Sequence, residues 1–349
     1  MFIELIAEYG LFLAKAITFV VAVIIVIGVI VSAGQRSPAD SEGHLEVKKL
    51  NEGLDAMEDT LRSLVLDGKA LKQFEKQKKK QAKSEKASKQ NTESAQSGNT
   101  YVIDFDGDMK ASAVKQFREV ITAVLTLADK SDEVVVRLES PGGMVHAYGF
   151  AASQLVRFKS AGIPLTICVD KVAASGGYMM ACIADKLLAA PFAVIGSIGV
   201  VASIPNFSKV LKKNDVYYEL LTAGEYKRTL TMFGENTDAA RQKFMQDLEE
   251  THDLFKDFVA DYRPALDIAS VATGETWYGK RALDKTLIDG ISTSDEYITQ
   301  RAKDASVFLV RFVEKKHWQE KLGVAVEAAL EKTLYRTVSR SMQSWESRH

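Results

Sequence analysis

The chain has few of the side chains that bind metal ions or form disulfides. It contains five histidines and two cysteines among 349 residues. These are too few and too scattered for a zinc site with the usual ligand spacing, so we expect neither a metal nor a cofactor. Cys168 and Cys182 allow at most one disulfide, and both lie in apolar stretches typical of small core residues.

The chain also lacks an excess of charge of either sign. Its formal net charge is -1, so no overall field favours binding to nucleic acid. Hydrophobic residues make up 46% of the sequence, which is enough for a sizeable core. At this length we expect one or two folded domains.

Charge is absent from residues 16–35, a run of 20 residues rich in Val and Ile. Because this length matches the hydrocarbon core of a bilayer, we predict an N-terminal transmembrane helix within a membrane anchor over residues 1–36. Ser32-Ala33-Gly34 resembles a cleavage site, so a cleaved signal peptide is the alternative. Lys15 and Arg36 flank the run almost symmetrically, so charge leans only slightly toward a cytoplasmic body.

Two segments separate this run from the folded body. Residues 37–72 carry apolar side chains at spacings typical of a short coiled coil, or of one amphipathic helix lying on the membrane or the body. The apolar positions are Val47, Leu50, Leu54, Met57, Leu61 and Leu64. Residues 73–100 are rich in Lys, Gln and Ser, cannot bury a core, and are predicted to form a solvated linker.

Strand-like and helical segments alternate over residues 101–300. This alternation predicts an α/β domain with a largely parallel sheet. The predicted strands are 101–105, 134–138, 165–169 and 186–190, and the predicted helices are 113–127, 147–159, 176–184, 207–213 and 237–262. Residues 187–204 are uncharged, but proline and glycines interrupt them, so we expect buried strand and turn there and no second span. Residues 301–349 are predicted to be a C-terminal extension with a basic amphipathic helix.

Ser175 lies between small residues where a predicted strand turns into a predicted helix. Such a turn exposes the hydroxyl, and the amides that follow favour negative charge. Glu139-Ser-Pro-Gly-Gly143 ends another predicted strand, so the amides of Gly142 and Gly176 are candidates for an oxyanion hole. The alternative for both segments is a small-residue turn that needs glycine for packing.

A serine nucleophile needs a base, and the residues alone leave its identity open. His146 and His252 lie in predicted helices, where most histidines have no catalytic role. Lys227 follows a predicted strand over residues 216–222 and a glycine turn, which places it at another strand end. A lysine acts as a base only when it is desolvated or placed among suitable dipoles.

Four motifs in this order resemble those of the signal peptide peptidase A family of membrane serine proteases, in particular its short, single-domain branch. The resemblance covers about residues 101–297, including a later element at 279–282 and 287–290. The motifs are Glu139–Gly143, Ala173–Tyr178, Ile195–Val200 and Ala223–Lys227.

The resemblance implies a Ser-Lys dyad in which Ser175 is the nucleophile and Lys227 the general base. Ser197 corresponds to the serine that holds the lysine, and Gly142 and Gly176 correspond to the oxyanion region. The family fold is a Clp-protease/crotonase-like spiral of strand-strand-helix units. Its members form homo-oligomeric rings with active sites across subunit boundaries, so Lys227 is a candidate to act on a neighbour's Ser175.

The resemblance further implies a catalytic body on the periplasmic side of a bacterial inner membrane, acting on apolar or signal-peptide-like peptides or on membrane proteins. Two residues depart from the family pattern: Arg228 follows the lysine, and Thr286 replaces a small glycine. A crotonase-fold acyl-CoA enzyme and a catalytically inactive membrane scaffold are the alternative hypotheses.

Overall fold

A computed structural model describes residues 43–74 and 98–314, together with 10, 13–15, 17–22, 76 and 80. The chain divides into two compact units, Leu45–Val313 and a second made of Met1–His44 with Glu314–His349. Most of the predicted anchor, most of the predicted linker and the predicted C-terminal helix lie outside the described residues. Within those residues, no helix combines the length and apolar character needed to cross a membrane.

The larger unit is mixed α/β, as predicted. In chain order its elements are β1 (Gly43–Lys49, whose first two residues precede the unit), α2 (Leu50–Val65), β2 (Thr100–Asp106), α4 (Val114–Leu125), β3 (Glu133–Glu139), α5 (Val145–Ala161), β4 (Leu165–Val169), β5 (Val172–Ala174), α6 (Gly176–Ala181), β6 (Lys186–Ala189), β7 (Val194–Gly196), α7 (Ser208–Lys213), α8 (Asp238–Tyr262), α9 (Ile268–Val271), β8 (Thr276–Tyr278), α10 (Gly279–Asp284), β9 (Gly290–Ile291), α11 (Ser294–Asp304) and β10 (Val307–Glu314). Every predicted strand and helix of residues 101–190 is present within a few residues of its expected bounds.

The main sheet has seven strands in the order β1-β10-β2-β3-β4-β6-β9. The pairs from β10 through β9 are all parallel. Strands buried on both faces need near-continuous apolar sequence, and all five residues of β4 are buried. Within residues 187–204, β6 and β7 supply the predicted buried strands, whereas residues 201–204 are exposed and form no strand.

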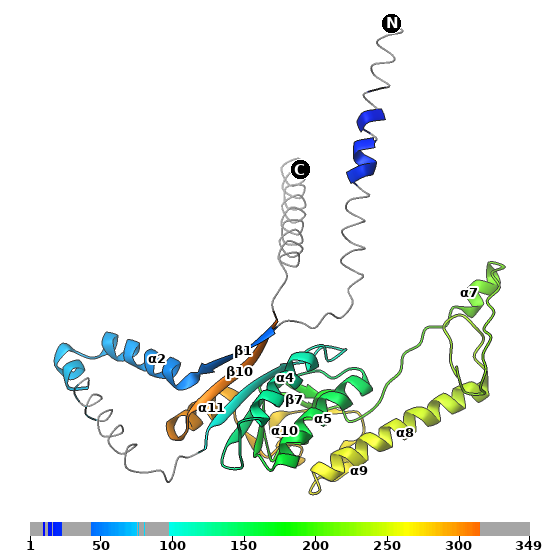
Figure 1. The fold of residues 1–349 in the computed structure, drawn as a ribbon. Helices are drawn as coiled ribbons and strands as arrows, with labels where there is room; N and C mark the ends of the chain where they lie inside the picture. Colours follow the sequence, from blue (N-terminus) through cyan, green and yellow to red (C-terminus); the bar gives the residue numbers. More distant parts are fainter. Residues whose placement is uncertain are drawn as a thin grey trace, which may run out of the picture. The chain divides into compact units, whose positions relative to one another are not determined.

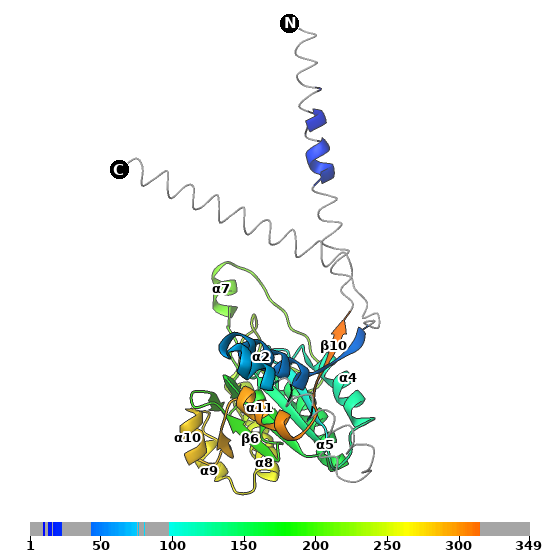
Figure 2. The same ribbon diagram turned by 90° about the vertical axis from the view of Figure 1, so that its left-hand side faces the viewer.

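The two faces of this sheet are covered by different helices. In β2, Ile103 and Phe105 pack into the core with α4, α5 and α6, whereas Val102 belongs to a smaller core with α11. Successive side chains of a strand point to opposite faces, which produces this division. Figure 1 shows α4 and α5 along one side of the sheet, and Figure 2 shows α2 beside α11.

A second, three-stranded sheet contains the strands that directly precede the predicted site residues Ser175 and Ser197. Its order is β5-β7-β8, with β5 parallel to β7 and β7 antiparallel to β8. A parallel bridge between Ser140 and Ala173 places β5 beside the end of β3. The carboxyl ends of strands from both sheets therefore meet at one place, where ligands collect in α/β proteins.

Residues 201–237, which we call the arm, differ from the prediction. We expected a strand over residues 216–222, but these residues form neither strand nor helix, and each is exposed. Their strand-forming side chains have no sheet edge to pair with in the described chain. Figure 1 shows the arm, with α7, projecting from the sheet beyond one end of α8.

Three further expectations are corrected by the structure. Residues 45–49 were predicted to start the amphipathic helix but lie in β1, at the sheet edge beside β10. The periodicity of the predicted helix 237–262 places four side chains on its inward face: Phe244, Leu248, Phe255 and Phe258. In α8 Phe255 is buried, whereas the other three are half-buried. Residues 301–314 complete α11 and form β10, so the folded unit extends past the predicted boundary at residue 300.

Thr286, one of the departures from the family pattern, has a φ of 59°. This is the left-handed region, which favours glycine and strains a β-branched residue. Its amide donates to the Leu283 carbonyl at 3.0 Å, and its own carbonyl accepts from Arg263 at 3.2 Å. The turn therefore keeps its shape without the glycine, with backbone strain at this residue.

Candidate active site

Ser175 lies at a sharp turn between β5 and α6. Its backbone has φ 53° and ψ -119°, a conformation that non-glycine residues seldom adopt. Two hydrogen bonds hold the turn: its amide donates to the Gly196 carbonyl at 2.8 Å, and its carbonyl accepts from the Met179 amide at 3.0 Å. Ser175 is half-buried, and a strained serine between a strand and a helix is the arrangement that exposes a nucleophilic hydroxyl in α/β-hydrolases.

Ser197 lies at the end of the neighbouring parallel strand. The register pairs Ala174 with Gly196, so Ser175 and Ser197 each follow a paired residue at the same edge. Ser197 also has a positive φ, 54°, and its amide donates to the Glu275 carbonyl at 2.6 Å. The structure therefore brings the two predicted serines to adjacent strand ends.

Gly142 packs directly against the Ser175 turn. A Cβ atom at Gly142 would lie 2.6 Å from the Ala174 carbonyl oxygen and 2.7 Å from the Gly176 nitrogen, and its φ is +88°. Only glycine fits this contact. Sequence and structure thus agree that the Pro-Gly-Gly loop lies beside the serine.

The amides near Ser175 differ in their availability. The Gly142 amide donates to Ser140 Oγ at 3.1 Å, so it is already engaged. The amides of Gly143 and Gly176 have no hydrogen-bond partner within the part of the chain that the structure describes. The Gly176 amide is unpaired because it opens α6, where the first N–H groups lack partners within the helix. Gly143 is therefore a donor that the motif alone did not distinguish from Gly142.

Lys227 lies in the arm. Its residue is exposed, and its amide donates to the Gly224 carbonyl at 3.2 Å in the predicted glycine turn. No hydrogen bond or ion pair of its side chain is found among the described residues. Within one copy of the chain, the structure groups Ser175, Ser197, Gly142 and Gly176 and places Lys227 in a different segment.

The other candidate side chains lie in different settings. His146 is exposed in the first turn of α5, and His252 is half-buried in the middle of α8. Cys168 and Cys182 are free and buried, which confirms their expected place in the core. Burial raises the pKa of the Cys168 thiol to about 12, so it stays protonated and is no nucleophile.

Two buried polar residues beside the serine turn, Ser140 and Tyr148, were not predicted as site residues. Ser140 belongs to the Pro-Gly-Gly motif, whereas nothing in the sequence marks Tyr148 apart from its place on the predicted helix. Both are fully buried, and their hydroxyl oxygens lie 2.6 Å apart. A buried hydroxyl pair of this kind is recognised only once the fold brings the two segments together.

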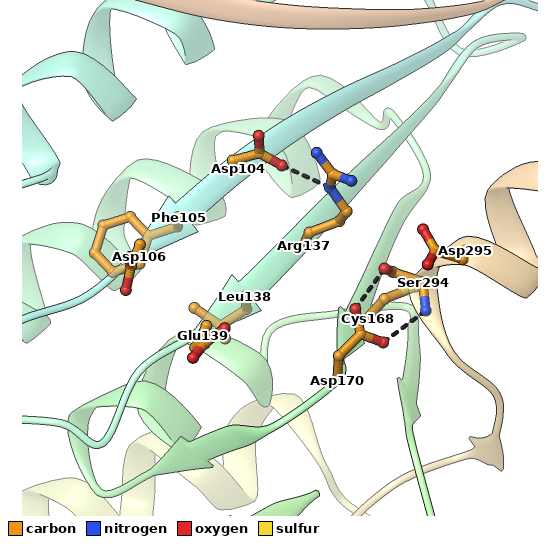
Figure 3. A pocket seen from close by; sticks show the side chains of 10 residues that line it. All are labelled: Asp104, Phe105, Asp106, Arg137, Leu138, Glu139, Cys168, Asp170, Ser294 and Asp295. Atoms are coloured by element: carbon orange, nitrogen blue, oxygen red, sulfur yellow. Dashed lines mark hydrogen bonds and ion pairs between the residues drawn. The ribbon is translucent and has the colours of Figure 1, made fainter. Parts of the chain in front are cut away.

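A separate cavity of about 400 Å³ lies at the carboxyl ends of β2, β3 and β4, and Ser175 is not among its lining residues. Figure 3 shows Arg137 beside Asp104, and Ser294 beside Asp170. Arg137 Nε lies 2.6 Å from Asp104, which also accepts from Arg311, and Asp170 accepts from the amide of Ser294 at 2.7 Å. These carboxylates are satisfied by internal partners, and the described residues contain no metal-binding group of three ligands.

Comparison with known proteins matches this chain to the models of one peptidase family and to proteases. The family model described as Peptidase family S49 N-terminal matches residues 4–155, and that described as Peptidase family S49 matches residues 157–308. The chain is 47% identical to "Probable protease SohB" of Haemophilus influenzae over 340 residues, which cover 95% of this chain and 96% of that protein.

More relatives match over shorter stretches. "Probable protease SohB" of Buchnera aphidicola subsp. Schlechtendalia chinensis is 60% identical over 201 residues, 58% of this chain and 66% of that protein. "Protease 4" of Salmonella typhi is 27% identical over 203 residues, 58% of this chain and 31% of that protein. Because the identity to a relative of similar length extends over nearly the whole chain, and the same glycine and serine motifs form one site, the chain belongs to peptidase family S49.

Proposed function

We propose that this protease is a membrane-anchored serine endopeptidase in which Ser175 is the nucleophile and Lys227 the general base. The observation that carries the proposal is the strained turn at Ser175, with the Gly142 backbone packed against it. This turn holds the half-buried serine next to the unpaired Gly176 amide and close to the 142–143 loop, which carries a second unpaired amide at Gly143. The fold in which it lies is a Clp-protease/crotonase-like spiral; the strand-strand-helix order β4-β5-α6, followed by β6 and β7 in the same two sheets, supports this part of the proposal.

The proposed reaction is acyl transfer. Ser175 Oγ attacks the carbonyl carbon of the substrate peptide, and its proton passes to the neutral amine of Lys227. The amides of Gly143 and Gly176 stabilise the oxyanion, while Gly142 shapes the loop. The peptide C–N bond then breaks, the proton passes to the leaving amine, and water hydrolyses the acyl-enzyme. Ser197 holds the lysine from the adjacent strand end.

Lys227 reaches a serine turn in an assembled homo-oligomeric ring. The arm that carries it exposes many apolar side chains, among them Tyr217, which is 99% exposed, and Leu221, which is 84% exposed. Large apolar surfaces of this kind mark protein interfaces. Packing of the arm on a second copy would remove water from around the lysine amine, the condition under which a lysine becomes a base.

The membrane anchoring follows from the uncharged run near the N-terminus, and the side of the membrane follows from the family resemblance. The uncharged run at 16–35 anchors the chain in the bacterial inner membrane, with the catalytic body on the periplasmic side. Substrates are extended peptides, apolar or signal-peptide-like, including segments of membrane proteins. They pair with a strand edge through main-chain hydrogen bonds.

The test is labelling of the full, detergent-solubilised chain with a fluorophosphonate. Ser175 Oγ displaces fluoride from phosphorus, and the hydroxyl proton goes to the base. We expect labelling of the wild type at Ser175 and none in Ser175→Ala or Lys227→Ala. A well-folded wild type that is not labelled would contradict the proposal and favour the inactive scaffold.

A further inference from the structure

Three hydrogen bonds, two of them buried, link the Pro-Gly-Gly loop, Tyr148 of α5 and Asp108. Tyr148 Oη donates to the Asp108 carbonyl at 2.8 Å. A tyrosine has one O–H, so in its 2.6 Å contact with Ser140 the serine hydroxyl is the donor. Ser140 Oγ in turn accepts from the Gly142 amide at 3.1 Å. The chain of bonds therefore has one direction, from Gly142 through Ser140 and Tyr148 to Asp108.

The backbone of Ser140 is tied to the nucleophile strand as well. Its amide donates to the Val172 carbonyl at 2.8 Å, and its carbonyl accepts from the Ala174 amide at 3.0 Å. Ala174 directly precedes Ser175. The Ser140 side chain thus fixes the loop at the point where its backbone fixes the strand that ends at the serine.

The ring of Tyr148 touches the other side of the site. A Cβ atom at Gly176 would lie 2.3 Å from Tyr148 Cγ, so the ring packs against the residue that follows Ser175. The Tyr148 hydroxyl is also close to Gly107, where a Cβ atom would lie 2.5 Å from it and 2.5 Å from Ser140 Oγ. Tyr148 itself is fully buried. One side chain therefore contacts, directly or through Ser140, both segments that present amides to the reacting carbonyl.

We propose that Tyr148 and Ser140 are positioning residues for the oxyanion hole: the Tyr148 hydroxyl, through Ser140, sets the 142–143 loop, and its ring sets the Gly176 amide. This inference rests on the proposed serine chemistry. Burial raises the pKa of Tyr148, and nearby carboxylates add to the shift, so the hydroxyl stays protonated and keeps the direction of the bonds.

The experiment uses Tyr148→Phe, which removes the hydroxyl and keeps the ring, and Ser140→Ala, which removes the middle of the chain of bonds. With a fluorogenic apolar peptide that the wild type hydrolyses, we expect kcat to fall by roughly 10- to 100-fold in each, and KM to stay within about threefold. A peptide boronic acid, whose tetrahedral adduct places an oxygen in the hole, should bind more weakly by a similar factor.

The double variant should be little worse than either single one, because both changes break the same chain of bonds. The matched control is Tyr297→Phe, on the opposite face of the sheet. It removes the hydrogen bond that the Tyr297 hydroxyl donates to Glu133 Oε1 at 2.5 Å. It should lose stability without changing kcat.

The proposal is overturned if Tyr148→Phe and Ser140→Ala keep the wild-type kcat, or change only KM or the melting temperature. If Tyr148→Phe does not fold, the same kcat and boronic acid measurements on Ser140→Ala decide the question. Failure of the proposed function gives a different result, since the wild type itself would then not react with the fluorophosphonate.

Discussion

Backbone hydrogen bonds and close packing fix the chain around Ser175, whereas few contacts fix the exposed arm that carries Lys227. The serine turn is fixed by backbone bonds to β7 and α6 and by glycine contacts that leave no room for a Cβ atom. In the arm not one of residues 201–237 is buried. Its internal order comes from a few local contacts, such as Asn206 donating to the carbonyls of Thr231 and Gly234.

The difference shows which parts of the proposed site the fold of one chain can build. A nucleophile and oxyanion donors need fixed positions, and the tightly packed ends of β3, β5 and β7 provide them. A lysine base needs a dry environment, which an exposed arm does not have until a second surface covers it. One copy of the chain therefore preorganises the proposed nucleophile and oxyanion donors but not the proposed lysine base.

The largest expected effect comes from inactivating the serine turn in one copy of the chain and the arm in another. Ser175→Ala and Lys227→Ala should each lower peptide hydrolysis by at least about 10³-fold, because neither retains both partners. If the arm serves a neighbouring copy, mixing and reassembling the two inactive proteins should restore a fraction of wild-type activity. The measurement is the hydrolysis rate of the mixture against each variant alone, and a mixture as inactive as its components would place both residues in one copy.

Substitutions at two glycines with positive φ, one beside the serine turn and one in the arm, compare how tightly the two regions are packed. At Gly142 a Cβ atom would meet backbone atoms at 2.6 and 2.7 Å, whereas at Gly224 in the arm the nearest is Lys227 Cβ at 3.9 Å. We expect Gly142→Ala to cost more than about 3 kcal/mol, a fall in melting temperature of roughly 6 °C or more. Gly224→Ala should cost only the backbone strain of about 1–2 kcal/mol, confined to the arm. Thermal unfolding followed by circular dichroism checks this, and equal losses would show that the arm is as tightly packed as the body.

Ion pairs give the smallest expected effect. Burial alone would raise the pKa of Asp289, but hydrogen bonds from Arg263 and the Leu187 amide hold it below its ordinary value. A lowered folded-state pKa stabilises the protein above the unfolded value, about 3.9, and this contribution disappears as pH falls through the folded value. Asp289→Asn should therefore be less stable than the wild type near neutral pH, and the difference should shrink below about pH 4.

Urea unfolding at pH 7 and pH 3 measures this difference. The control is Glu235→Gln in the arm, where Lys212 lowers the pKa of an exposed carboxylate. Exposed pairs contribute little, so this variant should match the wild type at both values of pH. A pH-dependent loss in Glu235→Gln as large as that of Asp289→Asn would contradict the distinction between the regions.

Most of the body was predictable because its signals are local. β4 has the predicted bounds, since a five-residue run with four apolar side chains before a turn has few alternatives to a buried strand. Ser175 and Gly142 were singled out because motifs of small residues mark close backbone contacts, and Ser197 was named through the family resemblance. The positive φ values at all three positions are the physical counterpart of those motifs.

The failures of prediction occur where a partner decides the conformation. Residues 216–222 have the composition of a strand, but a strand forms only when another strand accepts its hydrogen bonds. Residues 45–49 fit the apolar spacing of a helix, yet the edge of β10 makes them a strand. No sequence motif identified Tyr148. Its proposed role depends on a hydrogen bond with Ser140 and on packing of its ring against Gly176, and both contacts exist only in the folded protein.

The alternation of strands and helices, the family, and the small residues around the candidate serine were predictable from the order of the amino acids, because they depend on side-chain size and periodicity along the chain. The tertiary structure alone decided which amides remain unpaired beside Ser175, that Tyr148 contacts both sides of the site, and that Lys227 lies in an exposed arm. Those properties depend on which groups meet across segments distant in sequence, and hydrogen bonding and exclusion of water are fixed only when the segments pack.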